Sequence, residues 1–344
     1  MPVPVATILP AVLGLLCGAA FGLIVQRTHF CTMGGIADAV LFGDTRRLRA
    51  WLLAMAVALA ASQLLILAGA VDLATSVYRT HPVGVTGAVL GGGLFGFGMT
   101  QTGGCASRCL VRAGAGSLKA LVVVLVMGLS AAITLALHNV APASSAPLDA
   151  SSGETVVPFL GLGVAVALAA FGLTSAAFRR SRRDWLAGLA LGSLVPLAWL
   201  AQAHLVEATQ PPPAGLTFVA PTAAILLAGA VATFGGAAVI GTLLGGALGA
   251  WAGGTWRTER FAARDDTLRH LSGAVLMGFG GALAGGCTIG QGVSGLSTLA
   301  LPSILALVGI AAGGVLGVRA LEAGGALALL RRTAARLAGP GGPS

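Results

Sequence analysis

The residues best suited to chemistry are two cysteines, each preceded by two glycines inside an apolar stretch. The segment Gly96 to Cys105 recurs as Gly278 to Cys287, about half the chain further on, with six identities in ten positions. A thiol is a weak S–H donor with a polarizable sulfur, so it can contact a soft sulfur atom without holding it too tightly. The paired thiols are therefore candidate contacts for a small solute with a soft atom.

The glycine pairs Gly103-Gly104 and Gly285-Gly286 predict a break in a helix just before each cysteine. Glycine tolerates a turn, and a half-helix that begins near the cysteine directs free N–H groups and its positive dipole end at the site, where an anion is stabilised. In the alternative interpretation, the glycines only allow helices to pack closely and each cysteine is a small buried apolar residue. Recurrence of the motif at two related places favours the site.

A third candidate thiol, Cys31, lies in a semi-polar stretch between Arg27 and Asp44. This stretch is too short to span a bilayer, so we expect a re-entrant hairpin. In that arrangement the Cys31 thiol joins Cys105 and Cys287 near the middle of the membrane.

Two other cysteines and two polar residues are secondary candidates. Cys109 follows Cys105 by four residues, on the same helical face, and either supports the site or packs; we favour packing. Cys17 lies inside the first apolar stretch, where we expect packing. Arg108 precedes Cys109 directly, and His29 is a conceivable proton carrier, although a solvated histidine near the interface is the ordinary interpretation.

The elements that must position these residues are membrane helices. Of 344 residues, 56% are apolar and 9% charged, and the mean hydropathy is +0.92, whereas soluble domains carry roughly 25% charged residues. Eight charge-free stretches fit lipid contact: 8–26, 50–71, 83–107, 120–148, 155–178, 185–206, 208–256 and 271–318. Because about 20 apolar residues span a bilayer as a helix, the last two stretches hold more than one element each. We predict an all-α polytopic membrane protein with about nine transmembrane helices plus short re-entrant or half helices.

The basic loops predict the orientation. Lys and Arg gather at 46–49, 108–119, 179–183, 257–269 and 319–336, and we expect these loops in the cytoplasm. The net charge of +9 is spread over short loops as topology signals, so we expect no nucleic acid partner. The start of the chain has no basic segment, which predicts a retained first span. Threading the chain through the basic and non-basic sides places the N-terminus outside an inner membrane. The C-terminus, with a basic tail at 321–344, is then cytoplasmic.

The recurring motif also predicts internal symmetry. Its two copies are entered from opposite sides of the predicted topology, which indicates an inverted repeat with a pseudo-two-fold axis, as in many secondary transporters. Within one transmembrane domain, 1–344, we expect repeat 1 at 8–138, a connecting helix at 155–178 and repeat 2 at 185–320.

Over nearly its whole length the sequence resembles the YeeE/YedE family, whose best understood members import thiosulfate. The resemblance rests on Phe30-Cys31, on Gly103-Gly104-Cys105 and on the run from Gly285 to Gly292, which includes Gln291. It implies a thin pathway between the repeats, with Cys31, Cys105 and Cys287 along it and short hairpin helices supporting them. It also implies a possible TusA-like sulfur-carrier protein as a partner on the cytoplasmic side.

Several alternatives stay open at this point. The substrate is thiosulfate or a relative such as sulfide, sulfite or a selenium oxyanion. A metal transporter is less favoured because the sequence has no C-x-x-C or H-x-x-x-H cluster, and a membrane thiol oxidoreductase because it has no adjacent C-x-x-C pair. A receptor or a purely structural membrane protein is weakened by the repeat. We expect no enzyme activity, no catalytic residue, no metal and no cofactor.

Overall fold

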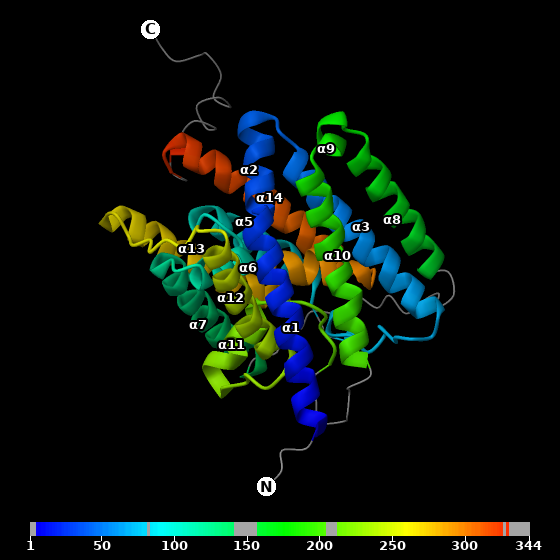
Figure 1. The fold of residues 1–344 in the computed structure, drawn as a ribbon. Helices are drawn as coiled ribbons and strands as arrows, with labels where there is room; N and C mark the ends of the chain where they lie inside the picture. Colours follow the sequence, from blue (N-terminus) through cyan, green and yellow to red (C-terminus); the bar gives the residue numbers. More distant parts are fainter. Residues whose placement is uncertain (1–4, 81–82, 141–156, 204–211, 326–327, 330–344) are drawn as a thin grey trace.

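The computed structural model describes residues 5–80, 83–140, 157–203, 212–325 and 328–329, and within them every regular element is a helix (Figure 1). In chain order these are α1 (Val5–Thr28), α2 (Thr32–Phe42), α3 (Arg46–Leu67), α4 (Val77–Thr80), α5 (Val85–Gln101), α6 (Ala106–Gly114), α7 (Leu118–Val140), α8 (Val157–Leu173), α9 (Ala176–Arg180), α10 (Arg182–Ala203), α11 (Val219–Ala228), α12 (Phe234–Ala252), α13 (Arg264–Leu283), the π-helical turn η1 (Gly290–Gly295) and α14 (Leu301–Ala323). The predicted all-α polytopic class is confirmed.

The predicted number of about nine spans is not established. Six helical stretches in the described residues are long and apolar enough to cross a membrane, the first of which includes α1. The others are α3, α7, α10, α12 and α14. The expected span 83–107 breaks into α5 and α6, and 271–318 divides into α13, η1 and α14. An apolar run gives the length of chain in lipid, but not whether that chain is one helix or two half-helices.

The helices pack in pairs that exchange the two halves of the chain. Helix α1 packs on α12 and α10 packs on α3; in the same way, α5 packs on α14 and α13 packs on α7. The short elements follow the same rule, with α6 on α12 and η1 on α3, and with α2 on α14 and α11 on α7. This reciprocal pairing is the pattern expected of two related repeats.

The seam between α1 and α12 is built from small residues. Gly14, Gly18 and Gly22 recur every four residues on one face of α1, and a Cβ on Gly18 would overlap the carbonyl oxygen of Ala238. From the other side, a Cβ on Gly245 of α12 would overlap the backbone of Ala19. The two backbones therefore touch directly, as in small-residue seams of membrane helices.

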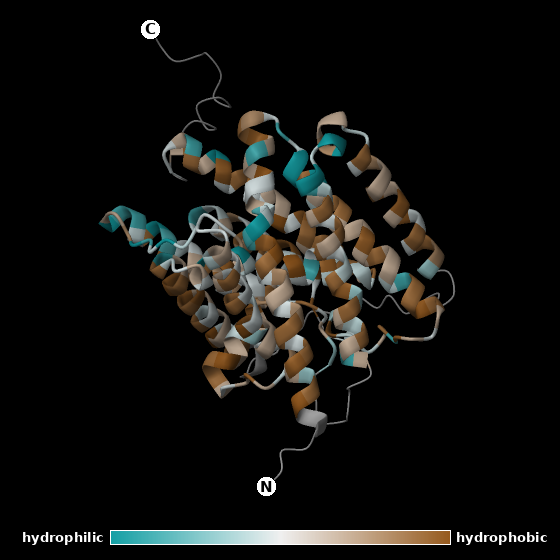
Figure 2. Cartoon of the chain, viewed as in Figure 1, coloured by the Kyte–Doolittle hydropathy of each residue, from teal (hydrophilic) through white to brown (hydrophobic). Residues whose placement is uncertain are grey.

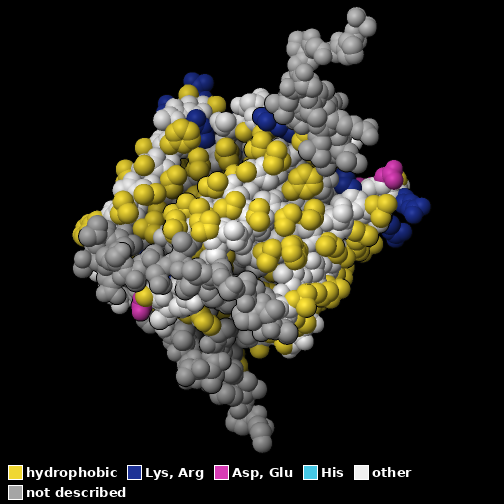
Figure 3. Space-filling view, turned by 180° about the vertical axis from the view of Figure 1, so that it is seen from behind, with side chains coloured by type: hydrophobic (Ala, Val, Ile, Leu, Met, Phe, Trp, Pro, Cys, Tyr) yellow, Lys and Arg dark blue, Asp and Glu magenta, His cyan; other side chains and the backbone are white. Residues whose placement is uncertain are grey.

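The outer surface is suited to lipid along the sides and to water at one end. Figure 3 shows hydrophobic side chains spread over a broad face, and Leu90, Phe159 and Val166 are each more than 60% exposed. Hydrophilic positions gather at the α2–α3 turn, at α9 and at the start of α13 (Figure 2). We call this the basic end; its arginines are Arg46, Arg47, Arg179, Arg180, Arg183, Arg257, Arg260, Arg264 and Arg269. Because α3 and α7 both begin near it, their last turns point to the opposite end.

Candidate functional site

The helix breaks predicted at the two glycine pairs are present and have the same geometry. Helix α5 ends two residues before Gly103, which has φ 69°, and α13 ends two residues before Gly285, which has φ 70°. The N–H of the residue that follows each of these glycines donates back to the helix. Gly104 N–H donates to the carbonyl oxygen of Met99 at 3.0 Å, and Gly286 N–H donates to that of Gly281 at 2.8 Å. Only glycine adopts this left-handed conformation without strain, which is why each chain can turn just before its cysteine.

Each of the three predicted pathway cysteines lies at the start of a short helical segment. Cys31 caps α2, and its Sγ accepts the N–H of Gly34 at 3.5 Å. Cys287 lies just before η1, and its Sγ accepts the N–H of Gly290 at 3.4 Å. Cys105 caps α6. A sulfur that accepts a backbone N–H keeps its own S–H for a further partner, and the positive ends of these segments face the thiols.

The fold brings these thiols into one interior cluster. The Cys31 thiol lies beside the Cys105 thiol, and Cys287 is close enough to Cys105 to interact with it electrostatically. Cys105 and Cys287 are buried, whereas Cys31 is half-buried. The cluster joins one thiol from the α2 segment, one from α6 and one from the segment that leads into η1.

The other two cysteines lie behind or outside this cluster. Cys109 is buried, and its thiol contacts the carbonyl oxygen of Gly104 at 3.5 Å, which fits the packing role that we favoured. Cys17 is half-buried on α1 and packs against the apolar core.

Two threonine hydroxyls next to the thiols make no hydrogen bond within the described structure. Thr32 follows Cys31 and Thr288 follows Cys287, and both hydroxyls are buried. Thr288 also lies beside Cys105. The Thr288 hydroxyl therefore faces the Cys105 thiol, whereas buried hydroxyls normally have a partner and Thr32 Oγ1 has none among the described residues. The sequence analysis missed both residues, although the same Cys-Thr pair occurs in each half of the chain.

A cavity of about 370 Å³ reaches the second motif from the end opposite the basic end; we call it the distal cavity. Gly285, Gln291 and Tyr78 are among the residues that line it. The Gln291 amide donates to the carbonyl oxygen of Ala284 at 2.6 Å, while its own carbonyl oxygen is buried without a partner. Tyr78 lies close to Cys287 and was not singled out from the sequence, because it lies in a predicted loop.

On the other side of the thiol cluster, towards the basic end, Arg108 meets His29. One guanidinium nitrogen donates to the carbonyl oxygen of Val25 at 3.1 Å, and another lies 3.1 Å from His29 Nδ1. His29 has φ 57°, an uncommon conformation for a residue other than glycine. Both secondary candidates are therefore next to the cluster.

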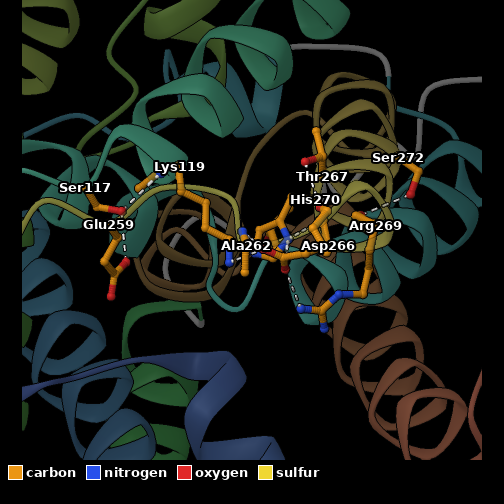
Figure 4. A network of polar contacts seen from close by, with 12 residues as sticks. Ser117, Lys119, Glu259, Ala262, Asp266, Thr267, Arg269, His270 and Ser272 are labelled. Carbon is orange, nitrogen blue, oxygen red and sulfur yellow. Dashed lines mark hydrogen bonds and ion pairs between the residues drawn. The ribbon is translucent and has the colours of Figure 1, made fainter.

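A polar network at the basic end, of which Figure 4 shows the part around Glu259 and Asp266, ties α6 to the α12–α13 loop. The Glu259 carboxylate accepts from Arg112 at 2.7 Å and from Ser117 at 2.9 Å, and the Arg112 guanidinium holds the pKa of Glu259 below its usual range. Nearby, Lys119 pairs with Asp266 at 2.7 Å. The α12–α13 loop is thereby tied over the turn between α6 and α7.

Comparison with known proteins gives a family and two curated relatives. The chain is 29% identical to the thiosulfate transporter TsuA of Escherichia coli (strain K12), over 81% of this chain and 86% of the relative. It is 26% identical to the thiosulfate transporter TsuA of Spirochaeta thermophila, over 86% of this chain and 94% of the relative. The model of the family described as Sulphur transport matches twice, at residues 27–184 and 162–316. With nearly the whole chain matched, this protein belongs to the Sulphur transport (YeeE/YedE) family.

Proposed function

We propose that this protein takes up thiosulfate across the inner membrane and passes the anion along the thiols of Cys287, Cys105 and Cys31. The observation that carries the proposal is the interior cluster of these thiols at the starts of three short helical segments. Membership of a sulphur transport family and likeness to two thiosulfate transporters support it.

The chemistry of the anion fits this cluster. Thiosulfate has hard, strongly hydrated oxygens and a soft terminal sulfur, so two kinds of contact must replace its water. The S–H groups can donate to the terminal sulfur without binding it tightly, because a thiol is a weak donor. The oxygens of the anion can accept hydrogen bonds from the backbone N–H groups at the starts of the short helices. They can also accept from the hydroxyls of Thr32 and Thr288.

We propose the direction of transport from the arrangement along the pathway. The anion enters at the distal cavity beside Cys287 and leaves past Cys31 and Arg108. The basic end is then cytoplasmic, as Lys and Arg in short loops favour, and the N-terminus is outside. The reciprocal helix pairing and the two family matches support the predicted repeats at 8–138 and 185–320 around the connecting segment 155–178. Most of the predicted basic tail, 321–344, lies outside the described residues.

Transport as a non-enzymatic function is what the relatives imply, and no covalent step is part of the proposal. A TusA-like sulfur-carrier protein would dock at the basic end, where the transported anion leaves the protein. The arginines of that end, named above, give a surface that attracts an acidic partner.

The test is uptake of radiolabelled thiosulfate into vesicles that contain the purified chain, in competition with sulfide, sulfite, sulfate and selenium oxyanions. We expect accumulation of thiosulfate that excess sulfate does not abolish, because sulfate lacks the soft sulfur. Preferential uptake of a selenium oxyanion would show that the substrate is a selenium compound rather than thiosulfate. Thiol-dependent electron transfer without accumulation would replace the transporter by an oxidoreductase.

A further inference from the structure

Arg108 carries a charge that no acidic side chain in the described part of the chain pairs with. It is half-buried on α6, and it makes no ion pair with any residue that the structure describes. Its partners are the Val25 carbonyl oxygen and the His29 ring, neither of which carries a negative charge. A half-buried guanidinium without a carboxylate is costly unless an anion meets it, since desolvation of a charge requires compensation.

The neighbours of Arg108 add to its charge. Arg47 and Arg183 are both near enough to His29 to affect it electrostatically. The nearby Asp38 is already engaged, because it pairs with Arg47 at 3.3 Å. Arg183 donates to the carbonyl oxygen of Arg27 at 2.6 Å and has no carboxylate partner in the described ranges. The space next to Cys31 is therefore surrounded by excess positive charge.

The position of Arg108 places this charge on the pathway. It follows Cys105 by three residues, about one turn of α6, and its Cβ and Cγ pack against Gly104 of the first motif. Both Cys31 and Cys105 lie within electrostatic range of its guanidinium. An anion that leaves Cys31 towards the basic end would therefore come close to this group.

We infer that Arg108, with His29 and Arg183, forms a second binding site for the thiosulfate oxygens at the basic end of the pathway. When the anion reaches Cys31, the guanidinium exchanges the Val25 carbonyl and the His29 ring for two oxygens of the anion. A guanidinium suits this role because its parallel N–H groups bind oxyanions in a bidentate manner. The inference rests on the proposed function, because it places this site after the thiols.

A purely structural role for Arg108 makes a different prediction. In that case its bonds to Val25 and His29 only latch α6 to the end of α1, and substitution lowers the stability of the protein without changing how well it binds an anion. The test therefore measures binding from the basic end in folded protein, with Arg108→Gln, Arg108→Lys and a control, Arg180→Gln. Arg180 lies at the same end of the molecule, but its side chain is exposed at the end of α9.

The full chain in nanodiscs is treated with a water-soluble maleimide, and alkylation of Cys31 is followed by peptide mass spectrometry while thiosulfate is titrated. We expect thiosulfate to protect Cys31 in the unchanged protein and in Arg180→Gln. We expect Arg108→Gln to need a thiosulfate concentration at least about tenfold higher for the same protection, because hydrogen bonds from a charged group are lost. The protective concentration for Arg108→Lys should lie between those of Arg108→Gln and the unchanged protein. All variants are first checked for an unchanged elution profile in size-exclusion chromatography.

Equal protective concentrations in Arg108→Gln and in the unchanged protein would overturn the inference. As a second measurement, efflux of thiosulfate from loaded vesicles should need a higher internal concentration for half-saturation in Arg108→Gln. If vesicles that contain the unchanged protein transport no thiosulfate at all, the proposed function fails. If they do transport thiosulfate, but Arg108→Gln leaves the protective concentration unaltered, only this second site is removed.

Discussion

The Glu259 carboxylate lies 2.7 Å from the Arg112 guanidinium and joins the α12–α13 loop to the last turn of α6. The contact links a predicted loop of one half of the chain to the half-helix that follows the first glycine pair. Since α6 also carries Arg108, the loop helps to fix the helix from which that side chain extends.

The first prediction is a loss of stability at acid pH that depends on Glu259. Its folded pKa is depressed by Arg112, so its contribution is present above the unfolded value of roughly 4.3 and is lost as the pH falls through the folded pKa. We expect Glu259→Gln to lower the free energy of unfolding at pH 7 by at most about 1 kcal/mol, because the pair is half-exposed. As the pH falls below the unfolded value of roughly 4.3, the difference between the variant and the unchanged protein should shrink.

Thermal unfolding in detergent, measured from pH 3.5 to 8, checks this. Glu322→Gln is the control, because Glu322 is exposed at the end of α14 and makes no ion pair within the described residues. A constant difference between Glu259→Gln and the unchanged protein at every pH would contradict the explanation.

The second prediction concerns the thiols. Serine nearly preserves the volume of cysteine but replaces a soft, weak donor with a hard hydroxyl. We expect Cys105→Ser and Cys287→Ser each to cut thiosulfate uptake about tenfold or more at unchanged protein abundance, as for loss of a contact of about 1.4 kcal/mol in the rate-determining state. Cys17→Ser should be nearly silent, because Cys17 packs on α1 outside the cluster.

Uptake per folded molecule in vesicles is the measurement for these variants, with abundance read by immunoblotting. Uptake that survives in both Cys105→Ser and Cys287→Ser would remove the thiol pathway, even with thiosulfate as the substrate.

The third prediction concerns the glycines at the helix breaks. Gly103 and Gly285 have φ near 70°, where a Cβ costs about 1–2 kcal/mol. Gly103→Ala and Gly285→Ala should lower the free energy of unfolding by this amount and reduce uptake, because the following cysteine shifts. Gly163→Ala on α8 is the control, since a Cβ there meets nothing within 4 Å. An unchanged melting temperature in both variants would argue against this account of the turns.

The fourth prediction concerns topology. Reporter fusions placed after Arg183 and after Arg269 should report the cytoplasm, because both arginines belong to the basic end. Alkaline phosphatase and green fluorescent protein are fused at each position in turn. Because the phosphatase is active outside and the fluorescent protein in the cytoplasm, each fusion is a control for the other. Phosphatase activity at either site would reverse the proposed orientation and the direction of transport.

Much of the site was predictable because it repeats. The two glycine pairs, their cysteines and the broken helices follow from one motif seen twice, and glycine has few other uses in the middle of an apolar run. The place of Cys31 was predictable as a short segment between Arg27 and Asp44. That these three thiols meet in one cluster was expected from the hairpin at Cys31 and from the family resemblance, but it depends on contacts between segments far apart in the sequence.

The remainder depends on contacts between segments far apart in the sequence. Thr32 and Thr288 stood beside the cysteines, but their lack of partners depends on what packs around them. Tyr78 lies on the short helix α4, which only the folded chain brings close to Cys287. The number of spans was not predictable from hydropathy either, because α11 with 10 residues and the broken segments are apolar without crossing as one helix.

The glycine seam between α1 and α12 has a consequence for motion. Where Gly18 meets Ala238, backbone touches backbone, and no side chain lies between them that could change its rotamer to accommodate a sliding or rotating helix. Large rigid-body rocking of one half against the other would have to separate the seam along its whole length. We therefore expect the anion to advance through small displacements of the short segments α2, α6 and η1 while the long helices stay fixed, which would make turnover far less sensitive to membrane thickness and viscosity than in a rocking carrier.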